Sequence, residues 1–358
     1  MKKLDYYIIK KFLGTFFFSI SLIIIIVIVF DISEKVDDFI ENEAPLRAII
    51  FDYYFNFIPF FINLFTPLFT YIAVVFFTAK MAANTEIVAI LSSGVSFRRM
   101  LVPYLISALF ITIITFFLAN FVIPHSNKKR LDFETIYINN RYRNTNRNIH
   151  IQTKPGEFIY IESYNNDYET GQKFTIEKIN NNVLNYKLSS ESIKWDSLTG
   201  KWQLNRYFIR EINGLEEKIT RGETLDTLLN FTPEIFVIKL KNVEVMNYSQ
   251  LRKFIKTEKL KGSKNVAFYK VEKNKRISFP FATIVLTLIG VSLSSRKLRG
   301  GIGLHLATGL IISFAFILFM QISTTFATYG NLSPLVAVWI PNIFFIFLAF
   351  YLLKTAPK

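Results

Sequence analysis

The chain has 358 residues and is 51% hydrophobic, with 38 phenylalanines, and its mean hydropathy of +0.31 is too high for an ordinary soluble protein. It contains no cysteine, which excludes a disulfide framework and a thiolate metal site. The net charge of +15 does not indicate nucleic-acid binding, because 12 basic residues lie beside apolar segments and the aromatic residues lie mostly within those segments. The composition is that of an integral membrane protein.

Six membrane-spanning helices are predicted, three before and three after a long polar segment. The first uncharged run, residues 12–30, has 19 residues, enough at ~1.5 Å per residue to cross a ~30 Å hydrocarbon core. It exceeds a signal-peptide core and lacks a small-residue cleavage site, so it is expected to stay uncleaved. The remaining apolar segments are residues 53–79, 100–123, 277–295 and 300–353, the last divided into two helices by the YGNLSP turn.

The lysines and arginines of the short loops predict the orientation. Basic residues cluster at the amino terminus, in residues 80–99, in residues 296–299 and at the carboxyl terminus, so these parts are expected in the cytoplasm. Residues 31–52 carry seven carboxylates and are expected outside. The long segment 124–276 is expected there too, since long translocated domains largely escape the charge rule. The predicted location is a bacterial inner membrane, with both termini cytoplasmic and the large domain periplasmic.

The outside domain is predicted to be all-β. Apolar and polar residues alternate in residues 156–164, 174–179 and 192–212, as in half-buried strands, and a further strand is expected at 234–245. Trp195 and Trp202 flank a hairpin turn. A helix is then expected from 249 to Gly262, and another from about Val266 into the fourth span. The predicted architecture is a six-span helical membrane protein, with domains 1–123, 124–276 and 277–358, and with a β-sandwich or roll as the inserted domain.

Several kinds of chemistry are missing from the sequence. No phosphate-binding loop is present, and the three histidines are far apart, so no catalytic, cofactor or metal site is predicted. The six spans contain no Asp, Glu, Lys or Arg, which ion-coupled transporters need at membrane depth. If the protein moves a substrate, a partner has to supply the energy.

The cytoplasmic loop between spans two and three predicts a short helix. Either Asn84 or Thr85 is expected to cap it, Glu86 complements its dipole, and Gly94 ends it. Two interpretations stand side by side: a helix that lies on the membrane, or a peg that docks in a groove of a cytoplasmic ATPase with Glu86 as its ionic contact. The predicted apolar face of this helix comprises Ile87, Ile90 and Leu91.

Motifs along the whole chain resemble those of the LptF/LptG permeases of the lipopolysaccharide export complex. The matching stretches include LDYYI, TEIVAILSSGVS, WDSLTGKWQL and RKLRGGIG, in that order. The LDYYI start and the YGNLSPLVAVWIPN end resemble the LptG branch more than LptF. The resemblance implies an ABC-transporter half that pairs with an LptF-like sister permease and sits on an LptB-like ATPase dimer. It also implies a jellyroll-like periplasmic domain that passes lipopolysaccharide to an LptC-like protein.

The resemblance also implies roles for particular residues. The family's coupling helix corresponds to residues 84–94, with Glu86 at its acidic contact to the ATPase. Its lateral gate for membrane lipid corresponds to residues 16–30 and 310–328. One departure is the acidic outer end of span one, where Lys35 is the only basic residue beside Asp31, Glu34, Asp37 and Asp38, which counts against phosphate recognition there. The gate candidates are Phe16, Ile23, Val27, Phe30, Lys35, Phe314, Phe319 and Thr325.

Three rival functions remain open at this point. A permease that exports peptides or drugs would also need a docking helix, but such permeases with large outside domains generally have four spans. A membrane-anchored receptor or scaffold would bind a periplasmic ligand without transport. An intramembrane protease is the third, although the spans contain no catalytic dyad.

Overall fold

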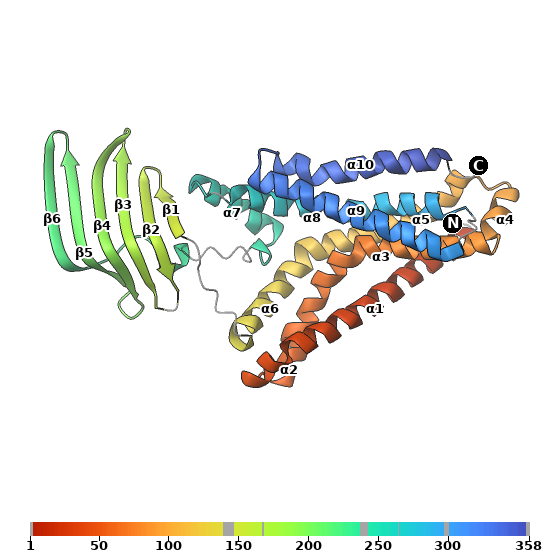
Figure 1. The fold of residues 1–358 in the computed structure, drawn as a ribbon, viewed down its shortest axis with the longest axis horizontal. Helices are drawn as coiled ribbons and strands as arrows, with labels where there is room; N and C mark the ends of the chain where they lie inside the picture. Colours follow the sequence, from red (N-terminus) through yellow and green to blue (C-terminus); the bar gives the residue numbers. More distant parts are fainter. Residues whose placement is uncertain are drawn as a thin grey trace. The chain divides into compact units, whose positions relative to one another are not determined.

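A computed structural model describes residues 3–138, 147–166, 168–236, 243–263, 265–296 and 301–355. The chain forms two compact units (Figure 1). The helical unit comprises residues 1–139, 244–251 and 267–358, and the β unit comprises residues 140–243 and 252–266. The β unit is therefore narrower than the predicted domain 124–276, because both ends of that range belong to the helical unit.

Six helical segments of the described chain are long and apolar enough to cross a membrane, which confirms the predicted three-and-three arrangement. The second and third each contain a π-helical segment, η1 and η2. The last two meet at a turn after Tyr329, as predicted. The α- and π-helical elements are α1 Lys3–Glu41, α2 Leu46–Ala48, η1 Ile49–Tyr54, α3 Phe55–Ala83, α4 Glu86–Ser92, α5 Phe97–Phe117, η2 Leu118–Val122, α6 Ile123–Tyr137, α7 Tyr248–Leu260, α8 Val266–Ser294, α9 Gly301–Tyr329 and α10 Pro334–Thr355.

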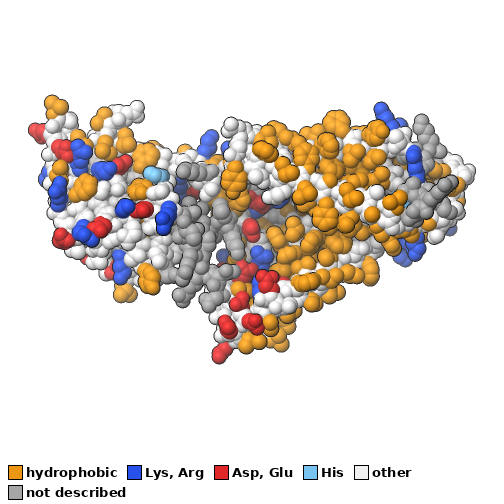
Figure 2. Space-filling model, viewed as in Figure 1, with side chains coloured by type: hydrophobic (Ala, Val, Ile, Leu, Met, Phe, Trp, Pro, Cys, Tyr) orange, Lys and Arg blue, Asp and Glu red, His pale blue; other side chains and the backbone are white. Residues whose placement is uncertain are grey.

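The helical unit has an apolar surface and a packed interior. Figure 2 shows a broad hydrophobic band over its helices, with charged side chains gathered toward its ends. Within the most apolar window of α8, 67% of the residues are buried, against 22% in α1 and in α9. The fourth span is therefore central, whereas the first and fifth expose most of their apolar residues, as lipid- or partner-facing helices do.

Glycines let two helices approach α3 closely. A Cβ atom on Gly309 of α9 would lie 2.7 Å from Cε1 of Tyr71, and one on Gly290 of α8 would lie 2.9 Å from Cγ1 of Val74. Small residues at helix contacts allow such close packing in membranes, where dispersion rather than the hydrophobic effect holds helices together. The α3 helix thus joins α8 and α9 into one body.

The β unit is one antiparallel sheet with its strands in sequential order. Alternate side chains form a core on one face, which includes Ile161, Phe174 and Leu204, and Phe231 and Phe236 pack against it. The inserted all-β domain is thus confirmed. The strands are β1 Arg147–Lys154, β2 Glu157–Asn165, β3 Thr170–Asn180, β4 Val183–Asp196, β5 Lys201–Asn213 and β6 Glu216–Thr227.

The tryptophan hairpin forms as predicted. Trp195 of β4 and Trp202 of β5 are direct cross-strand partners, with ring centroids 4.9 Å apart. The fully buried Trp202 donates from Nε1 to the carbonyl oxygen of Phe231 at 2.9 Å, so its one polar group is satisfied. The strand predicted at 234–245 lies largely outside the described residues.

The helices that follow the sheet also agree with the sequence. Asn247 and Gln250 cap α7 reciprocally, each accepting the other's backbone N–H at 2.9 Å. The α7 helix stops two residues before Gly262, whose φ is +71°. The α8 helix begins at Val266 and runs through the fourth span without interruption, also as predicted.

Candidate functional site

The short helix predicted between spans two and three is present as α4, at the end of the helical unit where both termini lie (Figure 1). Thr85 occupies the N-cap position with φ +62°, but its hydroxyl donates to the carbonyl oxygen of Asn84 instead of capping the helix. Gly94 follows the C-cap with φ +87°, and its N–H donates to Leu91 O at 3.0 Å. The helix therefore ends at the predicted glycine in the left-handed conformation that glycine tolerates.

The predicted apolar face of α4 points into the protein. Ile87 is buried, and Ile90 and Leu91 pack against the core shared by α1, α3 and α5. The exposed face instead presents Val88, whose side chain is 60% exposed. The three apolar residues fix α4 to the helical unit, so its exposed surface includes the polar face and Val88.

Side chains of α1 also contact this site. The hydroxyl of Tyr7 donates to Oε2 of Glu86 at 2.9 Å, and Nδ2 of Asn84 lies 3.3 Å from Oε1 of the same carboxylate. Close by, Arg99 at the start of α5 donates two hydrogen bonds, of 2.8 and 2.7 Å, to the buried carboxylate of Asp5. Such bidentate pairs have defined geometry as well as charge attraction. Together they connect α4, α5 and the beginning of α1.

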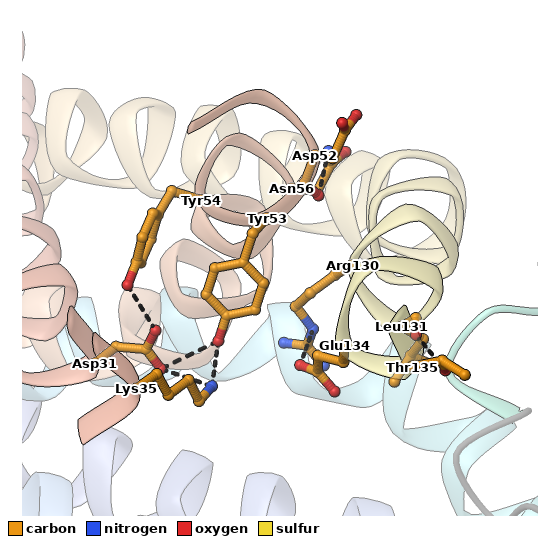
Figure 3. A network of polar contacts seen from close by, with 10 residues as sticks. All are labelled: Asp31, Lys35, Asp52, Tyr53, Tyr54, Asn56, Arg130, Leu131, Glu134 and Thr135. Carbon is orange, nitrogen blue, oxygen red and sulfur yellow. Dashed lines mark hydrogen bonds and ion pairs between the residues drawn. The ribbon is translucent and has the colours of Figure 1, made fainter. Parts of the chain in front are cut away.

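A second polar cluster lies at the opposite end of the helical unit (Figure 3). Tyr54 and Tyr53 donate to the two carboxylate oxygens of Asp31 at 3.0 and 3.2 Å. Lys35 forms an ion pair with Asp31 at 2.9 Å and donates to the hydroxyl of Tyr53. Lys35, the only basic gate candidate, is thus already paired within its own chain.

The helix α6 carries a separate ion pair beside this cluster. Arg130 Nε lies 3.4 Å from Oε1 of Glu134, one helical turn away (Figure 3). The guanidinium lies 5.5 Å from the ring centroid of Phe60. Phe133, which lies between Arg130 and Glu134 in the sequence, packs on Tyr53 with ring centroids 5.2 Å apart. The aromatic contacts hold α6 against the start of the second span.

The other gate candidates fall into two groups. Phe16 is buried in the core, and Ile23 and Val27 are half-buried against it and against neighbouring side chains. Phe30 of α1 and Phe314 and Thr325 of α9 are exposed, and Phe319 is half-buried against Phe344. The main neighbours of α1 are α3 and α5, and those of α9 are α3 and α10. Among the described residues, α1 and α9 therefore share no extensive contact with each other.

Sequence reasoning found α4 but missed the residues that bind it. Tyr7 and Glu86 are 79 positions apart and Asp5 and Arg99 are 94 apart, so no local pattern connects them. The sequence offered one signal for the Asp5–Arg99 pair: these opposite charges lie on two segments that are both predicted to be cytoplasmic. Within the described ranges, no group of three or more His, Asp or Glu side chains is placed to hold a metal ion.

Comparison with known proteins gives the family. A search of curated proteins finds no match. The family described as lipopolysaccharide export system permease LptF/LptG matches residues 6–355 of this chain. The structure of the chain has six apolar helices and an inserted β domain. Because the match covers nearly the whole chain, this protein belongs to the LptF/LptG family of lipopolysaccharide export permeases.

Proposed function

We propose that this permease is one half of an ABC transporter that extracts lipopolysaccharide from the inner membrane and passes it to a periplasmic bridge. A separate LptB-like ATPase dimer supplies the energy, an LptF-like sister permease completes the membrane channel, and an LptC-like protein receives the lipid. The chain itself is a non-catalytic subunit. Its termini lie in the cytoplasm and its β unit in the periplasm, a proposal supported by the lysines and arginines that flank the spans.

The observation that carries this proposal is the attachment of α4. Its apolar face is packed on the core, while Val88 is exposed and Glu86 is half-buried, and the helix lies at the end that holds both termini (Figure 1). A helix anchored in this way transmits a push to the spans instead of bending away. That is what a nucleotide-driven partner requires, because its closure acts on the permease only through contacts that move as one body.

The exposed apolar faces of α1 and α9 support a gate completed by the sister chain. Phe30 on α1 and Phe314 on α9 lie on helices with few buried residues, and these helices share no extensive contact among the described residues. In this proposal the sister permease packs on these faces and opens a passage for the acyl chains of the lipid. Phe16 then serves to anchor α1 and does not touch the lipid, since its side chain is buried.

A charge reversal at α4 tests the proposal. We expect Glu86→Lys to abolish copurification of the ATPase and to stop newly made lipopolysaccharide from reaching the cell surface. Glu86→Gln keeps the shape and removes only the charge, so we expect a partial loss. The matched control is Glu43→Lys, which makes the same charge change at an exposed residue at the opposite end of the helical unit.

Two results would contradict the proposal. If cells depleted of the protein deliver lipopolysaccharide normally, the transport function is wrong. If Glu86→Lys and Glu43→Lys behave alike, and both retain the ATPase, α4 is not the docking element. A receptor or scaffold without transport predicts the second result.

A further inference from the structure

A cavity of about 210 Å³ lies between α3, α6 and α8, away from α4 and from the exposed faces of α1 and α9. One part of its lining is apolar and includes Phe60, Leu64 and Phe279. The other part is polar and includes Asn127 and Lys275. Its volume is several times the ~30 Å³ that one water molecule occupies in the liquid, so it accommodates a larger chemical group.

Two asparagines of the cavity have unused hydrogen-bonding groups. Asn127 has no exposed surface, and neither its Nδ2 nor its Oδ1 has a hydrogen-bond partner among the described residues. Oδ1 of Asn63 is likewise buried without a partner in the part of the chain that the structure describes. Buried polar groups in native proteins almost always have partners. A buried amide without partners among the residues that line a cavity therefore indicates a polar ligand.

The lining carries two cations, Lys275 and Arg276, and two carboxylates, Glu244 and Glu272. Arg276 donates to Met246 O at 2.6 Å, lies 3.7 Å from the Glu272 carboxylate and is also attracted by Glu244. Lys275 is half-buried and forms no ion pair with any described residue. Its Nζ lies 5.9 Å from the ring centroid of Phe279. The cavity thus offers an ammonium group and an amide donor to an anion.

The position of the cavity selects an anion attached to a lipid. Lys275 and Arg276 directly precede the uncharged run 277–295, and Asn127 follows the uncharged run 100–123, so the polar lining lies where the apolar spans end. Phe60 and Leu64 lie within the second uncharged run. A ligand with a charged group at the membrane surface and hydrocarbon below it matches both parts of the lining.

We propose that this cavity binds the phosphodiester head group of a membrane phospholipid, with Lys275 as the counter-ion and the Asn127 amide as hydrogen-bond donor. The glycerol and the first methylenes of the acyl chains lie against Phe60, Leu64 and Phe279. The bound phospholipid is a resident part of the protein and not the exported lipid. This inference does not depend on the proposed transport mechanism.

The proposal is tested by measuring phospholipid binding to the full-length chain. The chain is purified together with whatever subunits are extracted with it. After delipidation, dioleoyl phosphatidylglycerol is titrated into detergent micelles, and bound lipid is counted by native mass spectrometry. We expect one saturable site in the wild-type chain. We expect Lys275→Gln to weaken it at least five-fold and Asn127→Leu, which replaces the amide with an apolar side chain, to abolish it.

Lys129→Gln is the matched control, because it removes a lysine from the exposed side of the helix that carries Asn127, and we expect it to bind like the wild type. Thermal unfolding of each variant separates lost binding from lost folding. Four results would overturn the proposal. These are no saturable site in the wild type, equal binding of dioleoylglycerol, displacement by millimolar inorganic phosphate, and one-for-one displacement by purified lipopolysaccharide.

Discussion

Tyr7, in the second turn of α1, donates a hydrogen bond of 2.9 Å to Glu86, the first residue of α4. The carboxylate that is proposed to meet the ATPase is therefore held by the helix that is proposed to line the gate. In the proposed mechanism, a displacement of α4 would reach α1 through this bond and through the apolar core that the two helices share.

Replacing Tyr7 by Phe removes only the hydroxyl and so tests that connection. A hydrogen bond of this kind contributes about 0.5–1.5 kcal/mol, so we expect ATPase affinity to fall by roughly two- to ten-fold, less than in Glu86→Gln. Affinity is measured by titrating the purified ATPase onto the permease. Tyr6→Phe serves as the control, because the Tyr6 side chain is 67% exposed. Equal losses in both variants would show that the Tyr7–Glu86 bond has no special role.

The bidentate pair between Asp5 and Arg99 makes a separate prediction about stability. Arg99→Gln leaves the carboxylate of Asp5 buried without its main counter-ion, which is unfavourable, so the melting temperature of the helical unit should fall. Adding Asp5→Asn removes the unpaired charge and should restore much of the loss. The measurement is a double-mutant cycle of thermal unfolding in detergent, and additive effects of the two substitutions would contradict the expected coupling.

The cluster around Lys35 predicts how the acidic outer end of α1 affects lipid binding. In Asp31→Asn the lysine loses its carboxylate partner and becomes free for a lipid phosphate, so more lipopolysaccharide should copurify at low salt. The same change should lower the free energy of unfolding by about 1.5–3 kcal/mol, the range for a hydrogen bond to a charged group, because the uncharged amide of asparagine keeps only one acceptor oxygen for Tyr53 and Tyr54.

Asp37→Asn is the control for that experiment, since it removes the same charge from an exposed position of α1. If both variants gain lipopolysaccharide equally, general repulsion by the acidic segment is responsible, and the pairing of Lys35 is not.

The turn between β4 and β5 gives a pH prediction. The Thr199 hydroxyl and the Leu198 backbone N–H donate to the Asp196 carboxylate and lower its pKa below the usual value. Since the folded state favours the ionised form, its contribution to stability is present above the unfolded pKa of ~3.9 and is lost as pH falls through the folded pKa. Thr199→Val should raise the pKa of Asp196, measured by NMR with labelled aspartate, whereas Thr224→Val on β6 should leave it unchanged.

Much of the architecture follows from patterns that the sequence displays directly. The uncharged runs predict the six spans, because each unpaired backbone group and each charge in hydrocarbon is costly. Alternation of apolar and polar residues predicts most strands, and the pairing of Trp195 with Trp202 follows from a turn flanked by like residues. These features depend on neighbours in the chain or on the solvent.

Which face of α4 packs against the protein was harder to predict from the sequence. A three-and-four spacing of Ile87, Ile90 and Leu91 predicts an apolar face but not what covers it, and here the core of the same chain covers it. The pairing of Lys35 with Tyr53 similarly depends on the approach of α1 to the start of the second span. Tertiary packing decides both, and the amino-acid pattern of one helix contains no information about the helix beside it.

The two π-helical segments, η1 at Ile49–Tyr54 and η2 at Leu118–Val122, have a consequence for how the chain tolerates changes of length. A π-bulge is in effect one extra residue accommodated by a wider turn. Deleting one residue within η2 should therefore convert it to a plain α-helical turn. The side chains of α5 and α6 would then keep facing the same neighbours as before. The same deletion in the middle of α5 would rotate everything beyond it by about 100°, since 3.6 residues make one turn. These two segments are thus the places where a span can become shorter without turning its apolar face away from its neighbours.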